Sequence, residues 1–304
     1  MTSSIPVILD TDIGGDIDDA WALAFLLKSP ELELKLIVTD SGNTTYRGAV
    51  AGKLLEAAGR TDIPIGVGIH QWDTTGPQEP WLDGYTLSDY PGQVFEDGVG
   101  AMVDLIMASP ELITLLCIGP VPNIKAAFER EPRIIAKVRI VGMFGSLRVG
   151  YDLSSEISSE YNVRAEVEAC RQMFASFPDI TITPLDTCGR VQLKGHKYKK
   201  VYDCKDPLIQ ALIASYHSWA EYVEWTKVDP RKYSSILFDT VAVYLAFSEG
   251  WLEIEELGIR VTEDGLTLID EKAKPIRCAT QWKDLTAFED FLVSRLTDAG
   301  SGKY

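Results

Sequence analysis

The segment VILDTDIGGDIDDAWALAFLL, residues 7–27, most constrains what this chain can fold into. It begins with an apolar run typical of a buried strand, passes through a glycine-containing turn and ends in a pattern typical of a helix. Five aspartates fall within ten positions of this segment: Asp10, Asp12, Asp16, Asp18 and Asp19. Because crowded carboxylates repel one another and prefer water, we expect a cation or a chemical reaction to account for them.

Apolar runs alternate with helical patterns along much of the chain. Strands are predicted at 6–10, 34–40, 63–68, 113–119, 136–145 and 179–185. Helices are predicted at 18–29, 46–59, 98–109, 121–130, 164–176, 206–225, 239–248 and 285–296, with a hairpin turn at 264–265 inside a small β element over 258–270. This alternation predicts an α/β fold: an open, mostly parallel sheet flanked by helices, with extra C-terminal helices. Without repeats or linkers, we expect one domain over 1–304.

The charge balance and the cysteines restrict the expected partners. The chain has 45 acidic and 29 basic residues, a net charge of −16, which would repel a nucleic-acid backbone. We interpret its densest basic run, KGHKYKK at 194–200, as a solvated loop. No apolar stretch reaches the roughly 18 residues of a membrane span, and no secretion signal is recognisable. The five scattered cysteines are typical of reduced thiols. We therefore expect a cytoplasmic protein with neither nucleic acid nor membrane as partner.

A divalent cation is the simplest account of the aspartates. Two of them end the first strand and two open the following helix, where Asp18 alone would suffice as a cap. Calcium takes about six to eight oxygens and favours carboxylates. An EF-hand does not fit, because its fifth and twelfth positions would be Gly14 and Trp21. A phosphatase-type DxDx[TV] motif does not fit either, because Gly14 stands at its last position.

The aspartate segment resembles the hallmark of a known family, the calcium-dependent nucleoside hydrolases of the inosine–uridine-preferring type. DTDIGGDIDDA is similar to the family's DxDPGxDDA pattern, with two extra residues in the turn. Further similar segments follow in the family's order: VTDSGNTT (38–45), IGPVPNIKAA (118–127), IVGMFGS (140–146), SSEYNVRAEVEA (158–169) and LFDTVAVYLA (237–246). The resemblance covers nearly the whole chain and implies the Rossmann-like fold of these hydrolases.

The resemblance implies a set of site residues. It matches Asp12 with a metal ligand that also acts as general base, and it implies that Ca²⁺ is the cofactor. The other implied metal ligands are Asp19, Asp239, the main-chain carbonyl of Ile118, and Asp10 as a ligand or outer-shell carboxylate. The groups implied to bind substrate are Asp18, Asn43, Glu160, Asn162, Phe144 and Phe238. Each of these motifs, taken alone, has an equally good structural explanation. Asn43 after Gly42 is consistent with a turn, Glu160 with Asn162 is consistent with a helix cap, and Asp239 is consistent with an N-cap.

The leaving-group side departs from the family pattern. Phe238 stands where purine-friendly members carry a histidine that helps the base to leave, and none of the three histidines falls in a matched motif. Candidates for protonating the leaving group instead are Tyr85, Tyr90 and a residue of 216–225. Alternatively, the leaving group needs no proton, or the substrate is not a standard nucleoside. Trp72, Trp81, Tyr85 and Tyr90 are candidates for stacking on a base or sugar, or for packing within their loop.

The favoured function is hydrolysis of the N-glycosidic bond of a ribonucleoside by a calcium-bound water that an aspartate activates. Carboxylates near the ring would stabilise the oxocarbenium-like transition state, and direct attack by water would invert the anomeric carbon. Two alternatives stay open: a hydrolase of another furanoside or carbohydrate conjugate, and a calcium-dependent sugar-binding protein without catalysis. The family resemblance also implies a homo-oligomer, a dimer or a tetramer.

Overall fold

Strand β1 (Ile5–Thr11) lies in the middle of the sheet, between the parallel strands β2 (Leu32–Thr39) and β5 (Ile113–Cys117). The computed structural model describes residues 4–298. Val7 and Leu9 of β1 pack into one hydrophobic core, whereas Ile8 packs into a second core on the other face of the sheet. Because successive side chains of a strand point to opposite faces, a strand that is covered on both faces is apolar throughout.

Within residues 4–298, ten strands form one sheet in the order β4-β3-β2-β1-β5-β6-β7-β10-β8-β9. Neighbouring strands are parallel from β4 to β10, while β8 runs antiparallel to β10 and β9 antiparallel to β8. The remaining strands are β3 (Ile65–Val67), β4 (Val94–Phe95), β6 (Val138–Met143), β7 (Ile180–Thr183), β8 (Leu252–Val261), β9 (Thr267–Ile269) and β10 (Pro275–Trp282). The predicted α/β fold with a mostly parallel sheet is confirmed.

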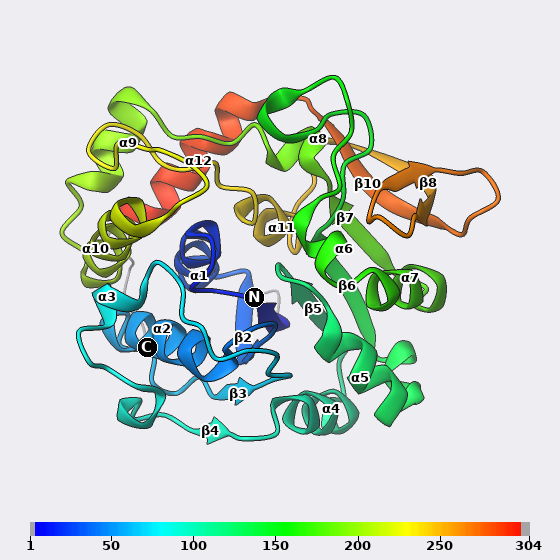
Figure 1. Cartoon of the computed structure of the whole chain (residues 1–304), viewed down its shortest axis with the longest axis horizontal. Helices are drawn as coiled ribbons and strands as arrows, with labels where there is room; N and C mark the ends of the chain where they lie inside the picture. Colours follow the sequence, from blue (N-terminus) through cyan, green and yellow to red (C-terminus); the bar gives the residue numbers. More distant parts are fainter. Residues whose placement is uncertain (1–3, 299–304) are drawn as a thin grey trace.

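Helices cover both faces of this sheet (Figure 1). The core on one face takes residues from α1, α2, α10, α11 and α12, and the core on the other from α4, α5 and α7. The α-helices are α1 (Asp18–Leu27), α2 (Thr44–Ala57), α3 (Glu79–Leu82), α4 (Gly98–Ala108), α5 (Pro122–Arg130), α6 (Tyr161–Ala165), α7 (Val167–Ser176), α8 (Leu185–Cys188), α9 (Gly195–Tyr202), α10 (Pro207–Tyr222), α11 (Thr240–Leu245) and α12 (Leu285–Thr297). Short 3₁₀ turns are η1 (Leu87–Asp89), η2 (Pro132–Ala136) and η3 (Tyr151–Leu153). No helix among residues 4–298 is long and apolar enough to cross a membrane.

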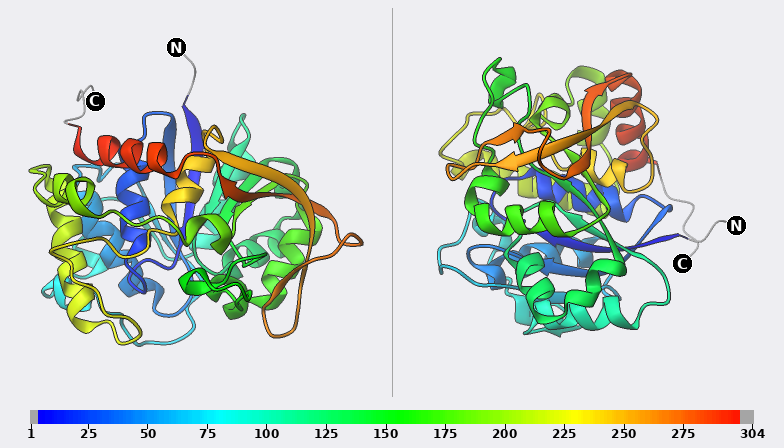
Figure 2. Two further views of the ribbon diagram at one scale, coloured as in Figure 1. Left: turned by 90° about the horizontal axis from the view of Figure 1, so that it is seen from above. Right: turned by 90° about the vertical axis from the view of Figure 1, so that its right-hand side faces the viewer.

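Two local predictions had different outcomes. The hairpin turn at 264–265 is confirmed, because Gly265 takes a φ of 82° between the antiparallel strands β8 and β9. These strands lie at the edge of the molecule, in orange in Figure 2. The prediction of a solvated loop at 194–200 is wrong, since this segment lies within and just before helix α9. Tyr198 and Val201, three residues apart, anchor one face of α9 in the core, which the dense lysines obscured.

The order of the strands places a crevice beside β1. From β1 the chain proceeds through β2, β3 and β4 toward one edge, and then returns to add β5, β6 and β7 on the other side. The carboxyl ends of β1 and β5 therefore meet at a topological switch point, where open α/β sheets bind their ligands. The aspartate turn follows β1 directly, so the fold delivers the acidic residues to this crevice.

Candidate active site

A cavity of about 1120 Å³ lies at the switch point, and nine of the eleven predicted site residues line it. These nine are Asp12, Asp18, Asp19, Asn43, Ile118, Glu160, Asn162, Phe238 and Asp239. They come from the β1–α1 turn, the start of α2, the end of β5, helix α6 and the start of α11. Segments that are up to about two hundred residues apart in the chain thus meet at one place.

The two other predicted residues do not reach the cavity. Phe144 was expected near the substrate, but it is fully buried and packs edge-on against Phe174, with ring centroids 6.1 Å apart. Met143 lines the cavity instead, because neighbouring side chains at the end of β6 point in opposite directions. Asp10 is also fully buried behind the cavity wall, where its Oδ1 accepts a hydrogen bond of 2.8 Å from Asn123.

Three carboxylates gather at the floor of the cavity. Asp18, Asp19 and Asp239 each offer an oxygen within 4.8 Å of the others, and all three are buried. The carboxyls of Asp18 and Asp239 lie close enough to repel each other when both are ionised, which favours a proton on one of them when no cation is present. Neither side chain caps its helix, so the alternative of simple capping is wrong for these two residues.

The electrostatics of the floor favour a cation. Burial, followed by repulsion from neighbouring carboxylates, raises the pKa of Asp18, Asp19 and Asp239 well above the usual value for aspartate. Burial also raises the pKa of Asp12, and it raises the pKa of Asp16 to about 6. A bound divalent cation would remove this penalty, and an all-oxygen donor set is the kind that calcium and magnesium prefer. The residues present therefore fit such an ion.

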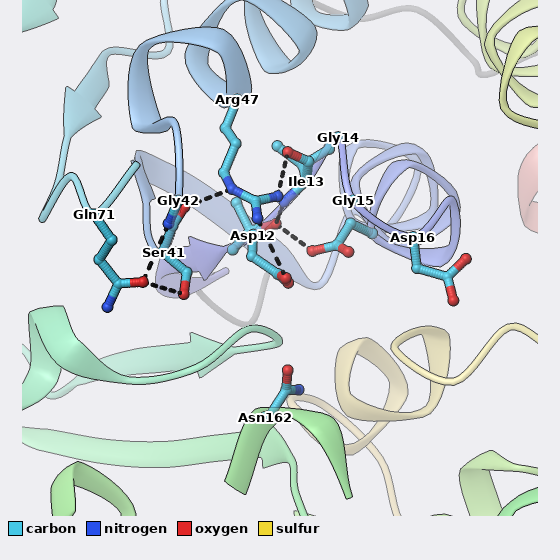
Figure 3. A network of polar contacts seen from close by, with 12 residues as sticks. Asp12, Ile13, Gly14, Gly15, Asp16, Ser41, Gly42, Arg47, Gln71 and Asn162 are labelled. Carbon is cyan, nitrogen blue, oxygen red and sulfur yellow. Dashed lines mark hydrogen bonds and ion pairs between the residues drawn. The ribbon is translucent and has the colours of Figure 1, made fainter. Parts of the chain in front are cut away.

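Arg47 lines the cavity and is a site residue that sequence reasoning missed. Arg47 extends from α2 to the aspartate turn, where its Nη2 lies 3.7 Å from Oδ2 of Asp12 (Figure 3). Its Nε donates to the carbonyl of Ser41 at 2.7 Å, and its Nη1 donates to the carbonyl of Ile13 at 3.0 Å. Asp40, which follows β2, is fully buried outside the cavity lining, and within residues 4–298 neither of its carboxylate oxygens accepts a hydrogen bond.

The predicted sugar-binding residues also have structural tasks. Asn43 caps α2 by accepting from Tyr46 N at 3.0 Å, and Glu160 caps α6 by accepting from the backbone N–H groups of Asn162 and Val163. The side-chain nitrogen of Asn162 donates to the carbonyl of Ile118 at 3.1 Å. Asn43 and Glu160 therefore both cap helices, as the alternative interpretation of Glu160 had it, and both also border the cavity. Their role in sugar binding stays a prediction.

Aromatic rings form much of the outer wall. Among the described residues, the rings that line the cavity are Tyr46, Trp72, Tyr151, Tyr161, Trp219, Trp225, Tyr233 and Phe238. Of the four loop aromatics proposed for stacking, only Trp72 lines it. Tyr85 donates its hydroxyl to Glu56 and Tyr90 donates to the carbonyl of Ile63, so neither is available as a proton donor to the cavity.

Comparison with known proteins decides the family. The model of the family described as inosine-uridine preferring nucleoside hydrolase matches residues 7–290. The chain belongs to this family. Nucleoside hydrolases are glycosidases, so the predicted enzyme class is confirmed.

Known nucleoside hydrolases and nucleosidases resemble the chain over most of its length. It is 29% identical to probable uridine nucleosidase 2 of Arabidopsis thaliana, over 91% of this chain and 89% of the relative. It is 30% identical to the non-specific ribonucleoside hydrolase RihC of Salmonella agona, over 64% of this chain and 65% of that enzyme. Two solved structures share its fold: a plant nucleoside hydrolase, PpNRh1 (TM-score 0.76, 23% identity, covering 97% of this chain and 100% of that one), and the purine-preferring ribonucleoside hydrolase of Gardnerella vaginalis (TM-score 0.76, 22% identity, covering 96% and 98%).

Proposed function

We propose that this nucleoside hydrolase cleaves the N-glycosidic bond of ribonucleosides with the help of a bound divalent cation, most simply Ca²⁺. The observation that supports the proposal is the group of Asp18, Asp19 and Asp239 at the floor of the cavity. Asp12 and several aromatic rings line the same cavity. Acidic groups suit a sugar that becomes positively charged, and aromatic rings suit a flat base.

Asp18, Asp19, Asp239, Asp12 and the carbonyl of Ile118 are the groups that would hold the cation. Such an ion supplies a polarised water and a fixed position for two adjacent sugar hydroxyls. Asn43, Glu160 and Asn162 border the same space and would bind the ribose hydroxyls. Asp10 lies behind this shell and supports it through its hydrogen bond with Asn123.

Asp12 would act as the general base. A carboxylate beside the attacking water accepts its proton while the water oxygen forms its bond to the anomeric carbon. The bond between that carbon and the base breaks on the opposite side, so the configuration inverts. The carboxylates around the floor would stabilise the oxocarbenium-like sugar as the bond lengthens.

The test is release of free ribose from a panel of purine and pyrimidine ribonucleosides, before and after treatment with a chelator. We expect turnover that the chelator abolishes and that added Ca²⁺ restores. Absence of turnover on every ribonucleoside, with calorimetry showing bound calcium, would contradict the proposal.

A second candidate is hydrolysis of another furanoside or carbohydrate conjugate. Phe238 supports it, because an apolar ring borders the cavity immediately before Asp239. This candidate predicts turnover of non-nucleoside pentosides where ribonucleosides fail. A cytoplasmic address and a homo-oligomer stay predictions, which fractionation and light scattering would test.

A further inference from the structure

Tyr151 lines the cavity, and within residues 4–298 no hydrogen-bond acceptor engages its hydroxyl proton. Its phenolic oxygen accepts a hydrogen bond of 3.0 Å from the backbone N–H of Tyr161. This contact fixes the position of the oxygen and leaves the O–H group free to donate. The side chain is 37% exposed, so a ligand in the cavity can reach it.

An unusual turn holds Tyr151 in place. The next two residues, Asp152 and Leu153, have φ angles of 54° and 60°, although neither is a glycine. Two hydrogen bonds close the turn: Gly150 N donates to the carbonyl of Ser154 at 2.9 Å, and Tyr151 N donates to Ser158 Oγ at 3.1 Å. Left-handed backbone at residues with a Cβ is strained, and such strain concentrates at functional sites.

The ring of Tyr151 lies beside the part of the cavity that suits a base. It packs edge-on against Phe238, with centroids 6.2 Å apart and planes at 83°. Phe238 directly precedes Asp239 of the acidic floor, so this aromatic pair borders the space next to the sugar position. A flat aromatic aglycone stacks favourably on such rings.

Other cavity tyrosines are placed differently. Tyr46 donates its hydroxyl to the carbonyl of Gly14 and is thereby occupied. Tyr161 also lines the cavity, but within residues 4–298 its ring makes no contact with that of Phe238. Tyr233 lines the cavity as well, and it likewise makes no ring contact with Phe238 within the described residues. Inversion requires the leaving group to depart away from the water, and the aromatic wall at Phe238 suits a base. Of these tyrosines, Tyr151 is the one whose ring contacts Phe238.

We propose that Tyr151 is the general acid that protonates the departing base, in the role that Phe238 does not fill. The inference rests on the proposed ribonucleoside hydrolysis. As the bond between the anomeric carbon and the base nitrogen breaks, its electron pair moves onto the base. The base takes the phenolic proton of Tyr151, and the resulting phenolate regains a proton from solvent. The attacking water delivers its oxygen to the sugar and its proton to Asp12.

The experiment compares wild type with Tyr151→Phe on two substrates. One is a ribonucleoside that the wild type hydrolyses, and the other is 4-nitrophenyl β-D-ribofuranoside, whose nitrophenolate departs without a proton. We expect Tyr151→Phe to lower kcat on the nucleoside about 10²–10³-fold, within the usual range for a general acid. On the nitrophenyl riboside, whose leaving group needs no proton, the kcat of the variant should differ from that of the wild type by less than about threefold, which corresponds to less than about 0.7 kcal/mol in the activation barrier.

Tyr161→Phe is the matched control, because it removes the neighbouring hydroxyl from the same wall. We expect this variant to change both substrates in the same proportion. The proposal is overturned if Tyr151→Phe lowers kcat equally on both substrates, or if it lowers kcat on neither. It is also overturned if Tyr161→Phe, rather than Tyr151→Phe, lowers kcat on the nucleoside alone. Melting temperatures within about 3 °C of the wild type would establish that the variants fold. A wild type that is inactive on all ribonucleosides would contradict the proposed function itself, which is a distinguishable result.

Discussion

The guanidinium of Arg47 and the carboxylate of Asp12 form a buried ion pair at 3.7 Å, between α2 and the turn after β1 (Figure 3). Arg47 also donates to the carbonyls of Ile13 and Ser41, so it joins the turn after β1 to the segment after β2. The chain thus supplies its own cation to one carboxylate of the acidic floor. Asp18, Asp19 and Asp239 are the other carboxylates of the proposed ion site.

Replacement of Arg47 should raise the affinity for a divalent cation. A unit charge about 4 Å from a carboxylate acts with roughly 4 kcal/mol at an effective dielectric constant of 20. Arg47→Met removes this charge, so we expect Ca²⁺ to bind about tenfold more tightly in calorimetry, while the chelator-treated protein loses stability by about 3–5 kcal/mol. Arg47→Lys keeps the charge and is the control. Weaker calcium binding by a folded Arg47→Met protein would contradict this account.

Replacement of Asp239 should have the opposite effect on cation binding. Asp239→Asn keeps the shape of the side chain but removes one of the three gathered carboxylates. Loss of an outer-shell partner of a metal ligand typically lowers metal affinity by roughly 10–100-fold. Because Asp239 is a proposed ligand itself, we expect its replacement to lower calcium affinity by at least this much. The matched control is Asp152→Asn, since Asp152 lines the same cavity but lies outside the group of three. Equal losses in the two variants would argue against a specific site.

Much of this fold follows from patterns that are local in the sequence. The apolar run of β1 is readable because both faces of that strand are covered, and the aspartates after it are readable because they are adjacent in the chain. The segment 194–200 misled prediction, since its lysines outnumber the two residues, Tyr198 and Val201, that anchor helix α9.

Residues that depend on tertiary contacts were harder to predict. Arg47 is one basic residue within a helix, and such residues usually face solvent, so nothing local indicates that it is buried against Asp12. Tyr151 depends on a turn with left-handed backbone at Asp152 and Leu153. Aspartate adopts this conformation more readily than most residues, but leucine rarely does, so the sequence does not indicate the turn. Phe144 was assigned to the cavity from its position in a motif, but its strand turns it toward the opposite core.

Asp12→Asn should abolish base catalysis while retaining the sugar site. The asparagine amide cannot accept the proton of the attacking water, so we expect kcat to fall by about 10²–10⁴-fold. Binding of ribose in the presence of calcium should weaken less than tenfold by calorimetry, because the other carboxylates remain. A variant that retains full turnover would show that another group accepts the proton.

The calcium-dependent stability of the protein should increase with pH. Burial, together with repulsion from Asp12, raises the pKa of Asp16 from 3.8 to about 6, that of Asp10 from 3.8 to about 7 and that of Glu160 from 4.5 to about 7. The folded chain therefore holds these protons more tightly than the unfolded chain. The stability that they contribute is fully present below about pH 4 and is lost as the pH rises through 6 to 7.

A bound divalent cation would offset this loss, because it stabilises the ionised carboxylates that protons no longer neutralise. We therefore expect calcium to raise the melting temperature little at pH 5 and by several degrees more at pH 8, with chelator-treated protein as the reference at each pH. The Asp239→Asn variant should show a smaller difference between the two pH values, since one gathered carboxylate is absent. A calcium effect that is larger at pH 5 than at pH 8 would contradict the link between the acidic floor and the ion.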